Sequence, residues 1–132
     1  MRLLSLDIGR HHTGIAFYDD ATGIPLPLDT ITHESVEALV DHVHALIRSR
    51  SIDRIIIGLP LLPSGEEGEQ VSFVREIGSV LASAGIPLSY VDERYTTPRA
   101  SISDGNAAAA CSLLQIALHK SLTNTHFSVA KY

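Results

Sequence analysis

The sequence predicts an α/β fold, in which a mixed five-stranded sheet carries helices on both faces. Two observations support this prediction. Three short apolar segments separated by turns open the chain, and helix-like and strand-like patterns alternate from Glu34 onward. The element order β-β-β-α-β-α-β-α then predicts three antiparallel strands followed by parallel ones. A length of 132 residues fits a single domain spanning residues 1–132.

The first three strands form a meander. Gly9 opens the turn between the first two strands, and we expect it to supply an unusual backbone angle there. Pro25 and Pro27 cannot donate ladder hydrogen bonds, so the third strand belongs at an edge of the sheet. The predicted strands cover residues 2–7, 13–18 and 26–32.

Helices and strands alternate in the rest of the chain. Residues 34–49 show an apolar stripe at helical spacing, and the β-branched run 54–60 predicts a strand buried on both faces. The sequence from Ser64 to Glu67 has the form of a capping box, so a helix should begin there and end at Gly85. A strand at 88–91 and a helix at 107–122 complete the pattern.

The composition narrows the function classes. No apolar run is long enough for a signal peptide or a membrane span, and the lone Cys111 cannot form an intramolecular disulfide. We therefore expect a cytosolic protein with no membrane partner. The net charge of −5 gives no general attraction to nucleic acid. Such a partner would have to be held by a local basic patch or by metal ions.

Acidic residues end two of the predicted strands. Asp7 ends the first strand, and Asp92 and Glu93 end the last. The carboxyl ends of parallel strands meet at one edge of a sheet, where ligand sites collect. Gly9, just after Asp7, would let a ligand or a backbone segment approach closely. Clustered carboxylates suit Mg²⁺ or Mn²⁺, so the pattern favours a metal site over isolated turn formers.

Four segments of the chain resemble the motifs of one family in order and spacing. They read DIGRHHTGIAF, IIIGLPLLPSGEEG, VDERYTT and NAAAACSLLQ. The family is RuvX/YqgF, which comprises Holliday junction resolvases and pre-16S rRNA nucleases with an RNase H-like fold. The resemblance covers residues 2–118.

The resemblance implies a catalytic, metal-binding set of Asp7, Glu93 and Asn106 holding two Mg²⁺ or Mn²⁺ ions. The family's third carboxylate is an amide in this chain, and the loop before it, 97–106, is short. Asp104 is the alternative third ligand. His11 and His12 stand where the family commonly has basic residues, and they could make cationic contacts when protonated.

The resemblance also implies substrate contacts, each with a simpler structural alternative. Arg94 would hold a phosphate or pair with Asp92. The segment that contains Gly58 and Pro60 would form one wall of the site, or merely connect a strand to a helix. Glu66, Glu67 and Glu69 are expected to be first-turn partners of the helix dipole and not metal ligands. The predicted substrate-binding residues are Gly9, Gly58, Pro60, Arg94, Thr96 and Thr97.

Three functions follow as hypotheses. The first is a metal-dependent nuclease acting on structured RNA or DNA, such as a pre-16S rRNA or a Holliday junction. The second is a nucleic-acid-binding or ribosome-assembly protein that has lost turnover, because Asn106 replaces a carboxylate. The third is an actin-like or sugar-kinase ATPase, although such enzymes need two of these domains. A junction resolvase would also need two symmetric active sites and hence a homodimer.

Overall fold

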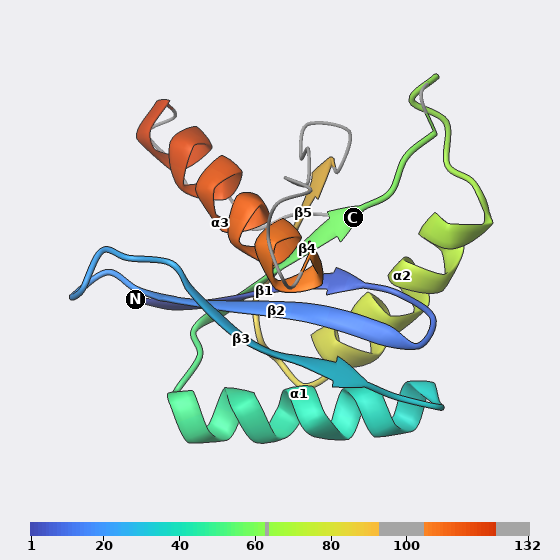
Figure 1. Ribbon diagram of the computed structural model, residues 1–132, viewed down its shortest axis with the longest axis horizontal. Coiled ribbons are helices and arrows are strands. Elements are labelled where there is room, and N and C mark those ends of the chain that lie inside the picture. Colours follow the sequence, from blue (N-terminus) through green and yellow to red (C-terminus); the bar gives the residue numbers. More distant parts are fainter. Residues whose placement is uncertain (63, 93–104, 124–132) are drawn as a thin grey trace.

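The computed structural model describes residues 1–62, 64–92 and 105–123, and for residues 105, 106 and 120–123 only the backbone. Five strands and three helices occur in this part of the chain, in the predicted order (Figure 1). The strands are β1 (Arg2–Ile8), β2 (His12–Asp19), β3 (Leu26–Thr32), β4 (Arg54–Leu59) and β5 (Leu88–Asp92). The helices are α1 (Val36–Arg50), α2 (Glu69–Ala82) and α3 (Gly105–Thr123).

The strands form one mixed sheet in the order β3-β2-β1-β4-β5. The pairs β1–β2 and β2–β3 are antiparallel, and the pairs β1–β4 and β4–β5 are parallel. The predicted fold class is therefore confirmed, and the edge position of β3 matches the prolines at its start. The carboxyl ends of β1, β4 and β5 meet at one edge, which we call the carboxyl edge.

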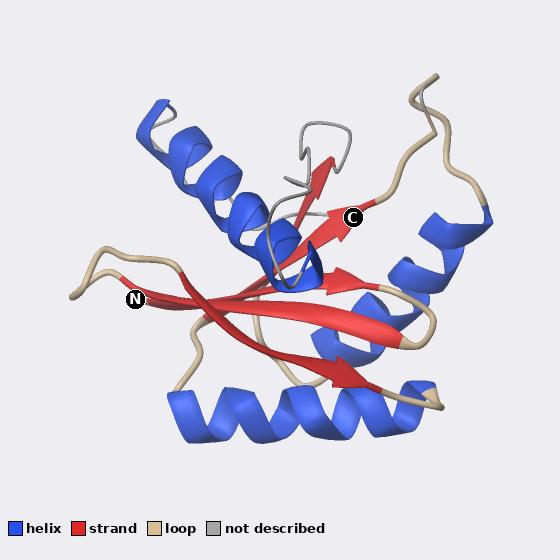
Figure 2. Ribbon diagram, viewed as in Figure 1, coloured by secondary structure: helices blue, strands red, loops and turns tan. Residues whose placement is uncertain are grey.

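Helices cover both faces of the sheet (Figure 2). The larger core lies between the sheet and the pair α1 and α2, and it contains Leu4, Leu6, Val43, Ile57 and Ile77 among its buried side chains. The smaller core lies under α3, and it contains Leu3, Ala16, Ile56, Val91 and Leu113. Neighbouring residues of a strand belong to different cores, so every central strand is buried on both faces. We refer to the two faces as the α1/α2 face and the α3 face.

The start and end of α2 differ from the prediction. The helix begins at Glu69 after the N-cap residue Gly68, which makes no side-chain cap. The predicted capping box is wrong, because the Ser64 hydroxyl accepts a bond from the Glu66 amide (3.3 Å) in a turn before the helix. At the other end, α2 stops at Ala82, before the left-handed Gly85. By contrast, a serine side chain does cap α1: Ser35 accepts from the Ala38 amide at 3.1 Å.

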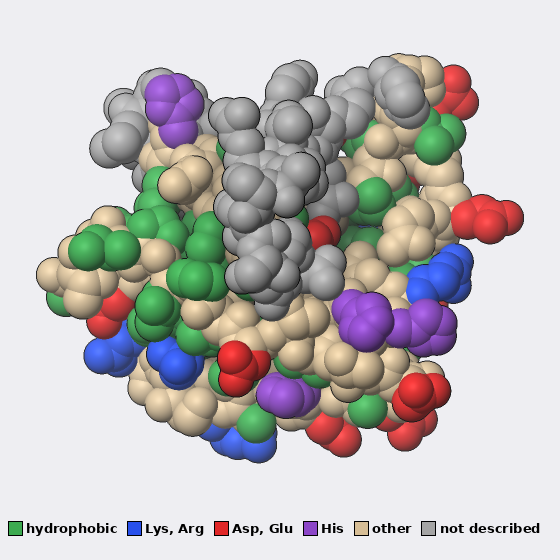
Figure 3. Space-filling view, in the orientation of Figure 1, with side chains coloured by type: hydrophobic (Ala, Val, Ile, Leu, Met, Phe, Trp, Pro, Cys, Tyr) green, Lys and Arg blue, Asp and Glu red, His purple; other side chains and the backbone are tan. Residues whose placement is uncertain are grey.

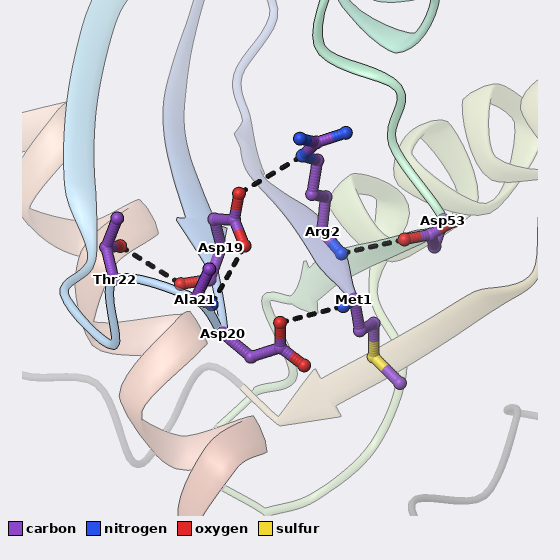
Figure 4. Close-up of polar contacts among 7 residues, drawn as sticks. All are labelled: Met1, Arg2, Asp19, Asp20, Ala21, Thr22 and Asp53. Carbon is purple, nitrogen blue, oxygen red and sulfur yellow. Dashed lines mark hydrogen bonds and ion pairs between the residues drawn. The ribbon is translucent and has the colours of Figure 1, made fainter.

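The edge opposite the carboxyl edge is held by a polar network (Figure 4). The N-terminal ammonium pairs with Asp20 at 2.8 Å, and the Arg2 side chain pairs with Asp19 at 3.1 Å. The Arg2 amide also donates to the Asp53 carboxylate at 2.8 Å. Hydrogen bonds from the Ala21 amide and from Arg2 lower the pKa of Asp19. These contacts join the start of β1, the end of β2 and the start of β4. They lie at the far end of β1 from Asp7.

None of the helices in the described part of the chain has the length and apolar character needed to span a membrane.

Candidate active site

Asp7 lies at the carboxyl edge on the α3 face. Its neighbours in β1, Leu6 and Ile8, point into the core of the α1/α2 face, so the partly buried Asp7 side chain points the other way. In the ladder, Asp7 pairs with Gly14 of β2. On its other side the pairing of Leu6 with Ile57, carried one residue further, puts Gly58 of β4 level with it. Asp7 therefore lies between two residues without side chains.

Helix α3 is held against β1 close to Asp7. The Ser5 hydroxyl donates a hydrogen bond to the carbonyl of Ala110 at 2.6 Å, and both residues are fully buried. Asn106 precedes Ala110 by one helical turn, and Asp7 follows Ser5 by two residues on the same face. Figure 1 shows α3 beginning over β1 and running back from the carboxyl edge. The backbone of Asn106 and the side chain of Asp7 are thus displaced from this contact towards the same edge, each by about 6–7 Å.

Most of the other predicted site residues lie outside the described part. On β5, Val91 packs in the core under α3 and Asp92 pairs with Leu59 at the carboxyl edge. Asn106 is described by its backbone alone, in the first turn of α3. The predicted site residues that lie outside the described ranges are Glu93, Arg94, Thr96, Thr97 and Asp104. The predicted grouping of Asp7 with Glu93 and Asn106 therefore stays a prediction.

Gly9 has one of the roles that the sequence suggested, but not the backbone angle. It does not take a positive φ, so the predicted unusual backbone angle is wrong. A Cβ at this position would lie 2.5 Å from the carbonyl oxygen of His12. The backbone of the β1–β2 turn closes against Gly9, which is one of the two kinds of close approach that the sequence suggested. The side chain of Gln70 in α2 donates to the carbonyl of Ile8 at 3.4 Å and supports the same turn.

The glutamates before α2 do not share one role. Glu69 alone is in the first turn of the helix. Glu67 lies before the helix and makes a bidentate ion pair with Arg75, at 2.9 and 2.8 Å. This hydrogen-bonded pair lowers the pKa of Glu67. The prediction that Glu66 and Glu67 belong to the first turn is wrong.

The predicted wall segment after β4 begins as expected, because Pro60 directly follows the last residue of that strand.

Two features of the site region were missed by the sequence reasoning. Gly14, inside a predicted strand, is the kind of residue that marks a close approach to a backbone or ligand, and that signal was available. The second feature is the pair of Thr13 and His33, both buried, whose Oγ1 and Nε2 atoms are 2.8 Å apart. His33 gave no periodic signal because it follows the edge strand.

The residues in place suit a cation but do not complete its ligand set. Asp7 offers a partly exposed carboxylate whose ladder neighbours, Gly14 and Gly58, have no side chains, and carboxylate oxygens are the ligands that Mg²⁺ and Mn²⁺ prefer. Within the described residues, no three His, Cys, Asp or Glu side chains are grouped so that they could hold a metal ion. A hollow of about 290 Å³ between β3 and α1 is lined by residues including Asp29, His42 and Arg50. It lies on the α1/α2 side of the sheet, away from Asp7.

Comparison with known sequences gives one consistent result. Residues 1–120 match the model of the RuvX family, described as Holliday junction resolvase. Three relatives carry the name "Putative pre-16S rRNA nuclease". The one from Anaeromyxobacter sp. is 36% identical over 98 residues, which are 74% of this chain and 72% of the relative. The one from Porphyromonas gingivalis is 37% identical (73% and 69% covered), and the one from Chloroflexus aurantiacus is 34% identical (72% and 63% covered).

Solved structures share the fold at low sequence identity. RuvC of T. thermophilus, solved in complex with a Holliday junction substrate, superposes with a TM-score of 0.66 at 13% identity, covering 95% of this chain and 98% of that one. The Fowlpox virus resolvase, solved with Holliday junction DNA, superposes with a TM-score of 0.56 at 11% identity, covering 94% and 100%. These likenesses show the common architecture of the sheet and its helices.

Proposed function

Because the chain belongs to the RuvX family, we propose that it is a metal-dependent nuclease that hydrolyses phosphodiester bonds of structured nucleic acid in the cytosol. The names of its relatives favour pre-16S rRNA as the substrate, which we propose is processed at its 5′ end, and the family's description, Holliday junction resolvase, favours a four-way DNA junction. For a four-way junction, two copies of the chain would have to act together, one on each of two strands.

The observation that carries the proposal is the position of Asp7. A carboxylate at the end of the central strand, on the face covered by α3, has two residues without side chains, Gly14 and Gly58, on either side of it, and such an arrangement suits a cation and a phosphate. The first turn of α3, which contains Asn106, is fixed to the same strand through Ser5. The proposal requires Glu93, the residue after β5, to complete the set with Asp7 and Asn106.

The predicted site residues have separate parts in this mechanism. Asp7 would hold a divalent ion together with Glu93 and the Asn106 amide oxygen, and such ions stabilise the entering and leaving oxygens of an in-line displacement by water. Gly14 and Gly58, the ladder neighbours of Asp7, bring no side chains of their own next to it. Arg94, Thr96 and Thr97 would contact the phosphate backbone, as would Gly9, Gly58 and Pro60 through their backbone groups.

A second function is favoured by one residue. Asn106 supplies an amide where the family has a carboxylate, so the ion site has one negative charge fewer. A chain with this change could bind nucleic acid during ribosome assembly without cleaving it. The family match speaks against the third hypothesis, an actin-like or sugar-kinase ATPase.

The experiment is a cleavage screen of the purified protein on a four-way DNA junction, duplex DNA and a structured RNA carrying the 5′ end of pre-16S rRNA, each with Mg²⁺ or Mn²⁺. The proposal predicts cleavage of at least one substrate that stops in excess chelator. Asp7→Asn keeps the shape of the side chain and removes its charge, so the rate should fall by at least about a hundredfold.

Asp29→Asn is the matched control, because Asp29 lies on the edge strand β3, beside the hollow under α1. It should cleave at the wild-type rate. Equal rates for wild type and Asp7→Asn would assign the activity to a contaminant or another site. Tight binding without cleavage, under every metal condition, would favour the assembly protein.

A further inference from the structure

The turn between β1 and β2 gathers positive and titratable side chains at the carboxyl edge. Arg10, His11 and His12 follow one another in the chain, and all three are exposed. Figure 3 shows histidine side chains beside a Lys or Arg side chain over the end of the sheet where β1 turns into β2. This cluster is notable because the whole chain has a net charge of −5. A polyanion that approached the protein would therefore need such a local patch.

His12 lies on the same face of the sheet as Asp7. Its neighbour Thr13 pairs with Ile8, whose side chain is in the core of the α1/α2 face, so His12 points to the α3 face. It is two residues from Gly14, the partner of Asp7, which places it diagonally from Asp7 at about 7 Å. The Nδ1 atom of His12 is 3.2 Å from the Thr32 hydroxyl on β3.

The backbone of the turn is fixed independently of its exposed side chains. The His33 amide donates to the His11 carbonyl at 2.8 Å, and the His12 carbonyl packs against Gly9. On the other face, the Arg10 guanidinium stacks over the Phe73 ring of α2, with its central carbon 5.0 Å from the ring centre. The turn therefore presents Arg10 on the α2 side of the edge and His12 on the α3 side, beside Asp7.

We propose that Arg10, His11 and His12 form a contact surface for the phosphate backbone of the nucleic acid, and that its affinity depends on the protonation of the two histidines. The inference rests on the proposed function and adds the substrate contact and its pH dependence. Arg10 supplies a permanent charge, while each histidine adds one only when it is protonated. Among the described residues, the charged and titratable groups on the surrounding elements are Asp7 on β1, His33 and Glu34 after β3, and Glu69 in the first turn of α2.

Burial keeps His33 apart from this titration. Burial, and then the positive charges of His11 and His12, lower the pKa of His33. Because of this lowered pKa, His33 stays neutral to a lower pH than an ordinary histidine. It can hold the His11 backbone in place in both states.

The test measures binding by fluorescence anisotropy of a labelled duplex, a four-way DNA junction and a structured RNA, in chelator so that cleavage is suppressed. At pH 6.0 the wild type should bind on the order of tenfold more tightly than at pH 8.0. On duplex DNA, the slope of log K against log salt should be steeper at pH 6.0 than at pH 8.0 by about 1 to 2. Each added phosphate contact contributes about 0.9 to this slope.

Two variants isolate the turn. The double variant His11→Gln/His12→Gln should bind with nearly equal affinity at the two pH values, while His42→Gln, with an exposed histidine on α1, should keep the wild-type pH dependence. The double variant His11→Lys/His12→Lys should bind tightly at both pH values. This gain cannot come from loss of folding.

The outcomes separate the two proposals. If the glutamine double variant retains the wild-type pH dependence, the turn is not the contact surface, although the nuclease proposal stands. If the wild type binds none of the nucleic acids at either pH in chelator, the contact surface is overturned, while the nuclease proposal is decided separately by the cleavage screen with Mg²⁺ or Mn²⁺.

Discussion

Ser5 and Ala110 are 105 residues apart in the chain and are joined by a buried hydrogen bond of 2.6 Å. Around this bond the interface between the sheet and α3 is apolar, with Leu3, Ile56 and Leu113 among its side chains. A hydroxyl buried at such an interface needs a hydrogen-bond partner. The backbone carbonyl of Ala110 accepts this bond from within α3. The bond therefore fixes how far α3 lies along β1, and with it the position of the first turn of α3 relative to Asp7.

The first prediction is that Ser5→Ala lowers the free energy of unfolding by about 1 kcal/mol, the usual value of one intramolecular hydrogen bond. Urea denaturation checks it. Ser83→Ala is the control, because Ser83 makes an equally short bond of 2.6 Å to the Val80 carbonyl, but in an exposed position within one turn. Its cost should stay below about 0.5 kcal/mol. Equal costs would show that the buried bond contributes nothing special to the position of α3.

The second prediction concerns Gly14, the residue that pairs with Asp7 in the sheet. Gly14→Ala places a methyl group about 5 Å from the Asp7 Cβ, where a bound cation or phosphate would need room. We expect at least a tenfold loss of Mn²⁺ affinity, measured by calorimetry, with a change in the free energy of unfolding below about 1 kcal/mol. The control Gly23→Ala should do the reverse. Gly23 has a left-handed φ of 74° at the opposite edge, so alanine there costs stability and leaves metal binding unchanged.

The third prediction is a loss of stability in mild acid that depends on His33. Its pKa is lowered from the ordinary 6.5, first by burial. The unfolded chain therefore binds a proton at His33 more readily than the folded chain. The contribution of His33 to stability is complete above pH 6.5 and is lost as the pH falls from there towards the lowered pKa, with a slope of at most about 1.4 kcal/mol per pH unit.

Urea unfolding of wild type and His33→Gln at pH 7.5, 6.5 and 5.5 measures this loss. The variant should be less stable than wild type at pH 7.5, because it changes the contact with Thr13, but its stability should fall less between pH 6.5 and 5.5. The exposed His42→Gln should follow the wild-type curve. Parallel curves for wild type and His33→Gln would assign the acid sensitivity to other groups.

The fold could be predicted because local patterns and tertiary packing agree. The run from Ile55 to Ile57 is β-branched, and each of its residues is fully buried. The start of α2 was missed because the Ser64 to Glu67 pattern bonds within a turn, while the real N-cap, Gly68, has no side chain to reveal it. The turn at Gly9 was predicted, but the unusual backbone angle expected there was wrong, because a close backbone contact and a positive φ both select glycine.

The site was predictable only in part. Asp7 could be found because its strand ends there, and even its face follows from the alternation with buried Leu6. Gly14 could be noticed as a glycine inside a strand, but its pairing with Asp7 could not be found, because neither strand alone specifies the register between them. The hydrogen bond of Ser5 to Ala110 depends on a helix 105 residues away. A local sequence pattern does not show which residues so far apart in the chain contact each other.

The fourth prediction is that Asn106, and not Asp104, is the third ligand. Asn106 lies in the first turn of α3, one turn before the Ser5 contact, whereas Asp104 precedes the helix. An amide oxygen can hold Mg²⁺ but has no charge. Two unit charges about 4 Å apart interact by ~4 kcal/mol at an effective dielectric constant of 20. If a third of this survives desolvation, Asn106→Asp should tighten Mn²⁺ binding roughly tenfold.

The matched variant is Asp104→Ala, which should leave Mn²⁺ affinity unchanged if Asn106 is the ligand. An aspartate in the first turn also stabilises a helix, so Asn106→Asp should raise the free energy of unfolding even without metal, and this effect is measured separately by urea denaturation. The gain in Mn²⁺ affinity is measured on the folded protein and should come with faster cleavage. The opposite pattern, a strong loss of binding in Asp104→Ala and no gain in Asn106→Asp, would identify Asp104 as the ligand. In that case the short loop before α3 supplies the carboxylate that the helix lacks.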